Sequence, residues 1–211
     1  GKEVESYYSY QAGGGIEALS KVNFKLTKQD QNHLSTVLPG AEFKIEKLEL
    51  NENSEFVSTK EVSQITDASG TITQDLDFDT LYKITETKAP DGYVLDNKPI
   101  YILDLKDKDE SYVTNIKNII KDGELFVRYK QQNFDIQVQN HKGEITVIKK
   151  FINDAAGKST NPVSGTYNFG LYTDKNDLTT PLQKVSITYN AGETQEKSVK
   201  FINLDLSETY Y

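Results

Sequence analysis

Three polar side chains stand in this sequence where apolar side chains are expected. Alternate residues of a β-strand point to opposite faces of a sheet, so residues two apart share a face. Each of the three ends a row of residues on one predicted face: Val22, Phe24, Leu26 and Lys28; Tyr82, Ile84 and Glu86; Phe134, Ile136, Val138 and Asn140. Burying a lone lysine or glutamate costs several kcal/mol or forces the group into its neutral form. Three polar residues at core-facing positions of one domain therefore indicate a reactive site.

The elements that would position these groups are strands. Thirteen tyrosines, frequent threonine, valine and isoleucine, and closely spaced turn residues indicate an all-β protein. The chain also repeats itself, since residues 22–28, 38–43 and 76–82 correspond to residues 145–149, 163–169 and 204–210. We interpret the repeat as two tandem β-sandwiches, a first domain at residues 20–141 and a second, incomplete domain at residues 142–211. Residues 1–19 are either the tail of a preceding domain or an edge strand.

One short helix is expected inside the first domain. Within residues 110–121, four apolar residues recur with the helical period and Gly123 follows as a C-terminal stop: Tyr112, Ile116, Ile119 and Ile120. This assignment places Asn115 on the helix, so Asn140 is the better core-facing asparagine. The acidic run from Asp104 to Glu110 is expected to be a solvated turn that leads into the helix.

The composition argues against several classes of function. The 211 residues carry 24 Lys and Arg against 32 Asp and Glu, and the net charge of −8 argues against nucleic acid or an anionic membrane as a partner. No apolar run is long enough for a transmembrane helix, and the chain does not begin with a signal peptide. Because cysteine is absent, neither disulfides nor thiol chemistry is available.

No segment predicts a cofactor or a metal site. Asp75, Asp77 and Asp79 followed by Glu86 superficially copy a calcium loop, but the sixth position is Thr80 rather than glycine. The two histidines have neither metal-ligand nor triad spacing, and no segment resembles the nucleophile elbow of a hydrolase. We therefore expect no cofactor, no metal and no enzymatic turnover.

Residues 82–93, Tyr-Lys-Ile-Thr-Glu-Thr-Lys-Ala-Pro-Asp-Gly-Tyr, resemble the E-box of Cna-B-type Ig-like domains. These domains occur in the sortase-assembled pilins and collagen-adhesin stalks of Gram-positive bacteria. Lys28 before Gln29-Asp30, the Leu-Pro-Gly-Ala-Glu-Phe segment at 38–43, and Asn140 at the end of the last strand match the family's other landmarks. The resemblance covers residues 20–140 with all landmarks and residues 143–211 with the first half of them.

In that family, a lysine amine condenses with an asparagine carboxamide, which releases ammonia and leaves an intramolecular isopeptide bond. The resemblance makes Lys28 the nucleophile, Asn140 the acceptor and Glu86 the acid/base group. An apolar setting would lower the pKa of the lysine and raise the pKa of the glutamate, as an attacking amine and a proton shuttle require. Such a self-modification happens once, so the protein would not be an enzyme.

The second domain contains a counterpart of Lys28. Lys149 shares a predicted face with Ile145 and Val147, at the end of the corresponding strand. The matching glutamate and asparagine would fall beyond Tyr211, so we expect no closed second bond within this sequence.

The resemblance implies a structural subunit or stalk of a Gram-positive pilus or surface adhesin. Such a protein is secreted and anchored to the cell wall, and its partners are other pilin subunits joined by sortase. The sequence lacks the Tyr-Pro-Lys linkage motif of backbone pilins, which favours an ancillary pilin over a shaft subunit. The alternative is an adhesin module that binds host extracellular matrix or an epithelial surface through strand edges or loops. Neither reading involves insertion of this segment into a membrane.

Overall fold

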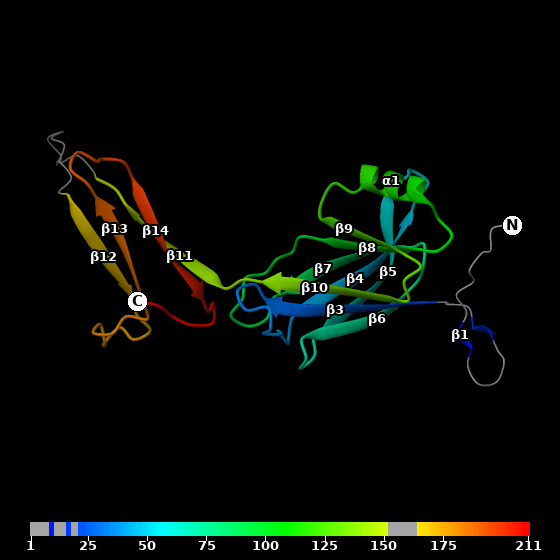
Figure 1. The fold of residues 1–211 in the computed structure, drawn as a ribbon, viewed down its shortest axis with the longest axis horizontal. Helices are drawn as coiled ribbons and strands as arrows, with labels where there is room; N and C mark the ends of the chain where they lie inside the picture. The colour runs from blue at the N-terminus through cyan, green and yellow to red at the C-terminus, as the bar shows by residue number, and fades with distance from the viewer. Residues whose placement is uncertain (1–8, 11–15, 18–20, 152–163) are drawn as a thin grey trace. The chain divides into compact units, whose positions relative to one another are not determined.

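The computed structural model describes residues 9–10, 16–17, 21–151 and 164–211. Within these ranges the protein is mostly β, with one short helix (Figure 1). The elements in chain order are β1 (Ser9–Tyr10), β2 (Ile16–Glu17), β3 (Val22–Asp30), β4 (Glu42–Leu50), β5 (Phe56–Ile65), β6 (Thr71–Leu76), β7 (Leu81–Lys88), β8 (Ile100–Leu105), α1 (Glu110–Ile119), β9 (Glu124–Tyr129), β10 (Asn133–Asn140), β11 (Gly143–Lys149), β12 (Gly165–Leu171), β13 (Gln183–Tyr189) and β14 (Lys197–Leu204). The predicted fold class, an all-β protein with one inserted helix, is confirmed.

The described chain divides into two compact units. The first contains the described residues up to Ala89 together with Leu95–Gln139, and the second contains Pro90–Val94 together with the described residues from Asn140 to Tyr211. The short segment Pro90–Val94, which follows strand β7, thus packs with residues that come much later in the sequence.

The first unit is a sandwich of two sheets. One sheet has the strand order β10-β3-β6 and the other has the order β5-β4-β7-β8-β9 (Figure 1). Buried side chains from both sheets form one core: Val22, Phe24, Leu26, Ala41, Phe43, Ile45, Ile72, Leu76, Tyr82, Ile84, Ile102, Phe134 and Ile136. Along β3, β7 and β10 these residues alternate with more exposed ones, as expected for strands with one buried face.

Strands β3 and β10 are neighbours and run in the same direction (Figure 1). Near the start of both strands, the N–H of Asn23 donates to the carbonyl of Gln132 at 2.7 Å, and Asn23 Nδ2 donates to Asn133 Oδ1 at 3.2 Å. Lys28 lies near the end of β3, and Asn140 is the last residue of β10. Among the described strands, β10 is the outer strand of its sheet, with β3 as its one neighbour.

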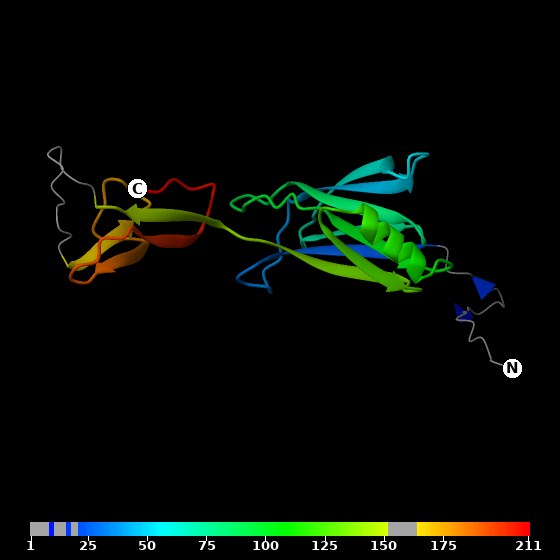
Figure 2. The same cartoon turned by 90° about the horizontal axis from the view of Figure 1, so that it is seen from above.

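Helix α1 covers the outer face of the five-stranded sheet, where it connects β8 to β9 (Figure 2). A second core lies beneath the helix: Leu48, Leu81, Tyr101, Leu103, Leu105, Val113 and Ile116. Because α1 carries the chain across the sheet, β8 and β9 pair in parallel, the usual result of a helical crossover. Strand β8 is consequently covered on both faces, which explains why five of its six residues are buried.

The helix begins one residue after Asp109, whose side chain accepts hydrogen bonds from the N–H groups of Ser111 and Tyr112 at 3.0 and 3.4 Å. The helix ends at Ile119, two residues before the end of the predicted range, and Gly123 follows with a φ of +79°. Asn115 lies within the helix, as predicted.

Asp104 corrects one expectation. We expected it in a solvated turn, but it belongs to β8 and is 2% exposed. Along β8, Asp104 shares a face with Ile102 and therefore points toward the sandwich interior. The solvated turn begins after β8, where the backbone N–H groups of Lys106, Asp107 and Lys108 donate to the carboxylate of Asp79. Asp104 is thus the last acidic position of the buried strand rather than the first residue of the turn.

The second unit contains two two-stranded sheets, β11-β14 and β12-β13. Its core is small: Leu171, Phe201 and Leu204 are buried, and Val147, Phe169, Val185 and Tyr210 pack against them. A tyrosine–aspartate contact occurs at corresponding positions of the predicted repeat. The hydroxyl of Tyr82 bonds to Asp77, and the hydroxyl of Tyr210 donates to the carbonyl of Asp205 at 3.1 Å.

The expected strand at residues 163–169 corresponds to β12, which begins at Gly165, while Val163 lies outside the described residues. Most of residues 1–19 also lie outside them, but Ser9–Tyr10 pairs with Ile16–Glu17 in a sheet of its own.

None of the helical structure described here has both the length and the apolar character needed to span a membrane.

Candidate functional site

Lys28 and Glu86 form an ion pair inside the first unit. Lys28 Nζ lies 3.0 Å from Glu86 Oε1, and the two side chains are 0% and 1% exposed. Lys28 follows Leu26 on the inward face of β3, and Glu86 follows Ile84 on the inward face of β7. The alternation of each strand thus carries its polar residue into the interior, one position beyond the apolar core.

The surroundings of Lys28 are apolar. Phe43 is the register partner of Glu86 across β4 and β7, and the centroid of its ring lies 5.5 Å from Lys28 Nζ. Burial lowers the pKa of Lys28 below its ordinary value of 10.5, although the charge of Glu86 and, more weakly, that of Asp96 act in the opposite direction. The site therefore favours the neutral amine more than water does, while a proton acceptor stands within hydrogen-bond distance.

Asp96 is a site residue that the sequence did not indicate. Its backbone N–H donates to Glu86 Oε2 at 3.0 Å, so one carboxylate oxygen faces this amide and the other faces Lys28. Any residue type except proline can supply a backbone N–H, so no side-chain pattern marks this position. Glu86 also lines a cavity of about 230 Å³, together with Ile84, Asp96 and Ile136.

Asn140 ends the inward-facing row of β10 and is 1% exposed. Its Nδ2 donates to the backbone carbonyl of Val94 at 2.8 Å. Val94 is held in turn, because its N–H donates to the carbonyl of His141 at 2.9 Å. The carboxamide nitrogen of Asn140 is therefore fixed by a backbone acceptor, which orients the carbonyl carbon.

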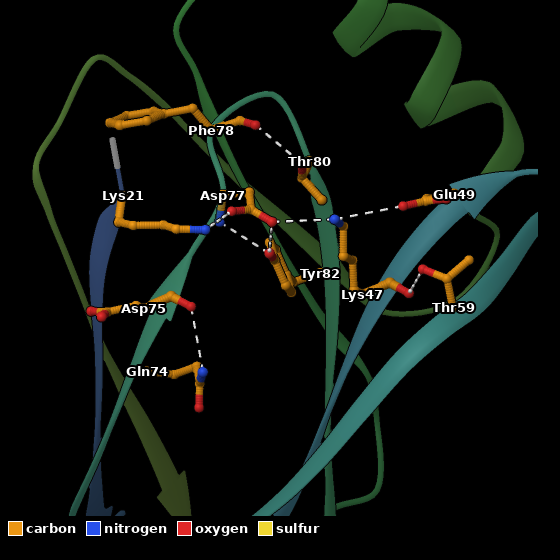
Figure 3. A network of polar contacts seen from close by, with 10 residues as sticks. All are labelled: Lys21, Lys47, Glu49, Thr59, Gln74, Asp75, Asp77, Phe78, Thr80 and Tyr82. Carbon is orange, nitrogen blue, oxygen red and sulfur yellow. Dashed lines mark hydrogen bonds and ion pairs between the residues drawn. The ribbon is translucent and has the colours of Figure 1, made fainter. Parts of the chain in front are cut away.

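A second lysine–carboxylate cluster of the first unit provides a contrast (Figure 3). Lys47 Nζ lies 3.2 Å from Asp77 Oδ2, and both Lys21 Nζ and the hydroxyl of Tyr82 also bond to this carboxylate. The Lys47 and Asp77 side chains are 28% and 33% exposed.

The pKa shifts at this second cluster favour the charged forms, unlike that of Lys28. The hydrogen bond to Asp77 raises the pKa of Lys47, and the hydrogen bond from Lys21 lowers the pKa of Asp77. Both groups are therefore held in their charged forms. A protonated amine is no nucleophile, so this cluster stabilises the fold as an ion pair and offers no route to a covalent bond.

Lys149, the candidate in the second unit, has a different environment from Lys28. Its Nζ lies 4.0 Å from the ring centroid of Tyr167 and 4.8 Å from that of Phe151. Among the residues that the structure describes, it forms no ion pair with a carboxylate. Its ring contacts are therefore aromatic, whereas Lys28 has a buried carboxylate as its partner.

The aspartates that superficially copied a calcium loop do not converge. Asp77 faces two lysines, whereas Asp79 accepts hydrogen bonds from the backbone that follows β8. No group of three or more potential metal ligands is found in the described part of the chain.

One family model matches part of the chain. Residues 22–119 match the family model of the SpaA prealbumin-like fold domain. No curated protein matches the chain.

Solved structures that are similar to the chain include two pilus proteins. The Bacillus anthracis TIE protein is 22% identical, with a TM-score of 0.43, over 87% of this chain and 27% of its own. The pilus 2b backbone protein of group B streptococcus is 20% identical, with a TM-score of 0.40, over 64% of this chain and 46% of its own. A C-terminal fragment of the pilus adhesin SpaC from Lactobacillus rhamnosus GG is 20% identical, with a TM-score of 0.40, over 60% of this chain and 47% of its own.

The chain thus spans less than half the length of each of these three structures. The family match begins at the first residue of β3 and extends to the last residue of α1, so it includes both Lys28 and Glu86.

Proposed function

We propose that Lys28 and Asn140 form an intramolecular isopeptide bond, with Glu86 as the acid/base group. The observation that carries the proposal is the ion pair of Lys28 and Glu86, 3.0 Å apart and almost fully buried. A buried amine with a lowered pKa and an adjacent carboxylate are the two requirements for activating a lysine as a nucleophile.

The reaction balances without a cofactor. Glu86 takes a proton from the Lys28 ammonium, and the neutral Nζ attacks the carbonyl carbon of Asn140. Glu86 then passes this proton to the carboxamide nitrogen, which leaves as ammonia. Glu86 also takes a second proton from Nζ, so the new C–N bond becomes a neutral amide and Glu86 ends protonated. Holding both reactants inside a folded domain replaces the high concentration that a bimolecular condensation would need.

The environment of Asn140 supports its role as the acceptor. Val94 O receives a hydrogen bond from the nitrogen that would leave, and it would stabilise that nitrogen as it gains a proton. The parallel course of β3 and β10 brings the ends of both strands to the same end of their sheet (Figure 1).

Such a bond suits a structural role on a cell surface. A covalent tie between the first and last strands of a sandwich would carry tension past the strands between them. We propose a stalk domain of a Gram-positive pilus or surface adhesin, ancillary rather than shaft-forming, secreted and anchored to the cell wall beside other pilin subunits. In this proposal residues 20–141 form the bonded domain, residues 142–211 belong to a second domain, and neither acts as an enzyme.

Intact mass measurement tests the proposal directly. The wild-type chain should weigh less than its sequence predicts by the mass of one ammonia molecule. Three single variants, K28M, E86Q and N140A, should each have the full mass, because each lacks one participant. K47M is the matched control: it removes a lysine from the exposed ion pair with Asp77 and should keep the wild-type mass deficit. A wild-type chain of full mass would rule the bond out.

A further inference from the structure

One side chain holds the first residues of β10 in place. Arg128, on β9, donates from Nη1 to the carbonyl of Asn133 at 3.2 Å and from Nη2 to the carbonyl of Asp135 at 2.8 Å. The two carbonyls belong to alternate residues of β10, so the planar guanidinium spans two residues of the strand. Arg128 is the single arginine of the sequence.

The same guanidinium covers the core residue between these two carbonyls. The carbon at its centre lies 4.4 Å from the ring centroid of Phe134, which is fully buried. Phe134 packs edge-on against Phe24 of β3, with 6.4 Å between the ring centroids. Arg128 therefore fixes the backbone of β10 and the side chain by which β10 packs on β3.

Asp104 secures the turn that joins β9 to β10. It is the register partner of Arg128 across the parallel pair β8–β9, and its Oδ1 accepts a hydrogen bond from the N–H of Gln131 at 3.3 Å. The N–H of Lys130 donates to the carbonyl of Leu105 at 2.8 Å, and Lys130 has a φ of +53°. The turn is thus tied to the end of β8 at two successive residues.

These contacts matter because β10 is an outer strand. With β3 as its one neighbour among the described strands, it lacks the second ladder that fixes the register of an inner strand. A slip by one residue would turn Asn140 to the opposite face, and a slip by two would move it roughly 6–7 Å along the strand. Either change would remove the carboxamide from the place that condensation requires.

We propose that Arg128 is the positioning residue for the isopeptide bond, because it sets the register of the strand that presents Asn140. This inference rests on the proposed Lys28–Asn140 bond. Arg128 takes no part in the chemistry itself. Its guanidinium acts on the start of β10, and the backbone of the strand transmits the register to its last residue.

The test follows bond formation in time. The full chain is produced by cell-free synthesis, samples are quenched in denaturant at intervals, and the fraction that has lost ammonia is measured by intact mass. R128A should form the bond roughly tenfold to a hundredfold more slowly than wild type, the usual effect of a misplaced reactant. R128K keeps a cation near Phe134 but cannot bond both carbonyls in one plane, so its rate should fall between the two.

I116A is the matched control. Ile116 lies in the core beneath α1, so its replacement by alanine should destabilise the same unit without changing β10. The stabilities of R128A and I116A are compared in the N140A background, where no bond forms. At equal stability, I116A should keep the wild-type rate. If R128A is as fast as wild type, or no slower than I116A of equal stability, the positioning role is refuted. If R128A does not fold, the rate of bond formation in R128K is compared with that in I116A instead. A rate in R128K no slower than in I116A of equal stability then refutes the positioning role.

A second measurement separates this inference from the proposed function. If even the wild-type chain never loses ammonia, the bond itself is disproved. Amide hydrogen exchange in the N140A background still tests Arg128: R128K should lower the protection of Ile136 and Val138 on β10 while Ile84 on β7 keeps its protection. Unchanged protection on β10 would overturn the assignment.

Discussion

Lys28 Nζ and Glu86 Oε1 lie 3.0 Å apart with neither side chain more than 1% exposed. Lys47 and Asp77 in the same unit are separated by a similar 3.2 Å, yet their side chains are about a third exposed. Distance alone therefore does not distinguish a reactive pair from an ordinary surface ion pair. The difference is desolvation, which lowers the pKa of Lys28 but is outweighed at Lys47 by the hydrogen bond to Asp77.

Removing the bond should lower the stability of the first unit substantially. N140A leaves the ion pair intact but has no acceptor, so the denatured chain regains the freedom that a loop of more than a hundred residues would lose. By the loop-entropy relation used for disulfides, the expected loss is about 4–5 kcal/mol. Denaturant unfolding of wild type and N140A, followed by circular dichroism, measures it.

The hydrogen bond from Asn140 Nδ2 to Val94 does not contribute to that difference, because this nitrogen leaves the bonded wild type as ammonia. K47M breaks an exposed ion pair and should cost no more than about 1 kcal/mol. Equal losses in N140A and K47M would contradict a covalent tie.

The unbonded variant should become more stable as the pH rises. Because the pKa of Lys28 is lowered in the fold, the unfolded chain binds more protons between that lowered pKa and the ordinary 10.5. In this window, the stability of N140A relative to N140A/K28M should therefore increase with pH, and it should be lowest below the window. Denaturant unfolding at several pH values gives the difference between the two variants.

Taking the difference cancels the titration of tyrosines, which both variants share. The bonded wild type has no free amine at position 28, so it should lack this contribution. A flat difference between N140A and N140A/K28M would mean that Lys28 does not titrate abnormally in the fold.

Gly92 should tolerate alanine less well than Gly40. Both glycines have positive φ, +83° and +82°, so alanine costs about 1–2 kcal/mol of backbone strain at either position. A Cβ at Gly40 would meet nothing within 4 Å, but one at Gly92 would lie 2.3 Å from Asp205 Oδ1. That oxygen accepts hydrogen bonds from Ser207 N and Oγ at 2.8 and 2.6 Å. G92A should therefore cost about 1 kcal/mol more than G40A in denaturant unfolding.

A double-mutant cycle isolates the clash. In the D205A background the extra cost of G92A should disappear, leaving the backbone strain that G40A reports. An extra cost that persists without the Asp205 carboxylate would assign it to another contact.

Asp104 should oppose the stability of the first unit at neutral pH. Burial raises its pKa above the ordinary 3.8, and Asp79 adds to the effect, whereas the N–H groups of Gln131 and Lys130 and the charge of Arg128 oppose it. The folded chain then holds a proton that the unfolded chain has lost, so stability falls as the pH rises through the window above 3.8. Relative to D104N, the wild type should be less stable at pH 7 than at pH 4. A difference that does not change with pH would contradict this assignment.

Much of the first unit can be predicted from residue patterns. The alternation in β3, β7 and β10 indicates each strand and its inward face, and the spacing of Tyr112, Ile116 and Ile119 indicates the helix. These features are local, because they depend on which residues of a single element must be buried.

The parallel pairing of β8 with β9 is not local. Strand β8 is covered on both faces and shows no alternation, so its sequence does not reveal its neighbours. Asp104 was misassigned for the same reason, since an acidic residue in a doubly covered strand resembles the beginning of the acidic loop that follows. In the candidate site, Lys28 and Glu86 follow from alternation, while the backbone N–H of Asp96 has no signature in the sequence.

The strand order β10-β3-β6 also dictates when the first unit can be completed during biogenesis. A polypeptide that emerges from the ribosome or an export channel N-terminus first delivers β3 early and β10 about a hundred residues later. Until β10 arrives, one edge of β3 presents unpaired backbone groups, and such an edge recruits strands from other nascent chains. Strand β3, the first strand of the sandwich, is thus the last to have both edges paired. Prompt pairing with β10 protects the newly made protein from aggregation.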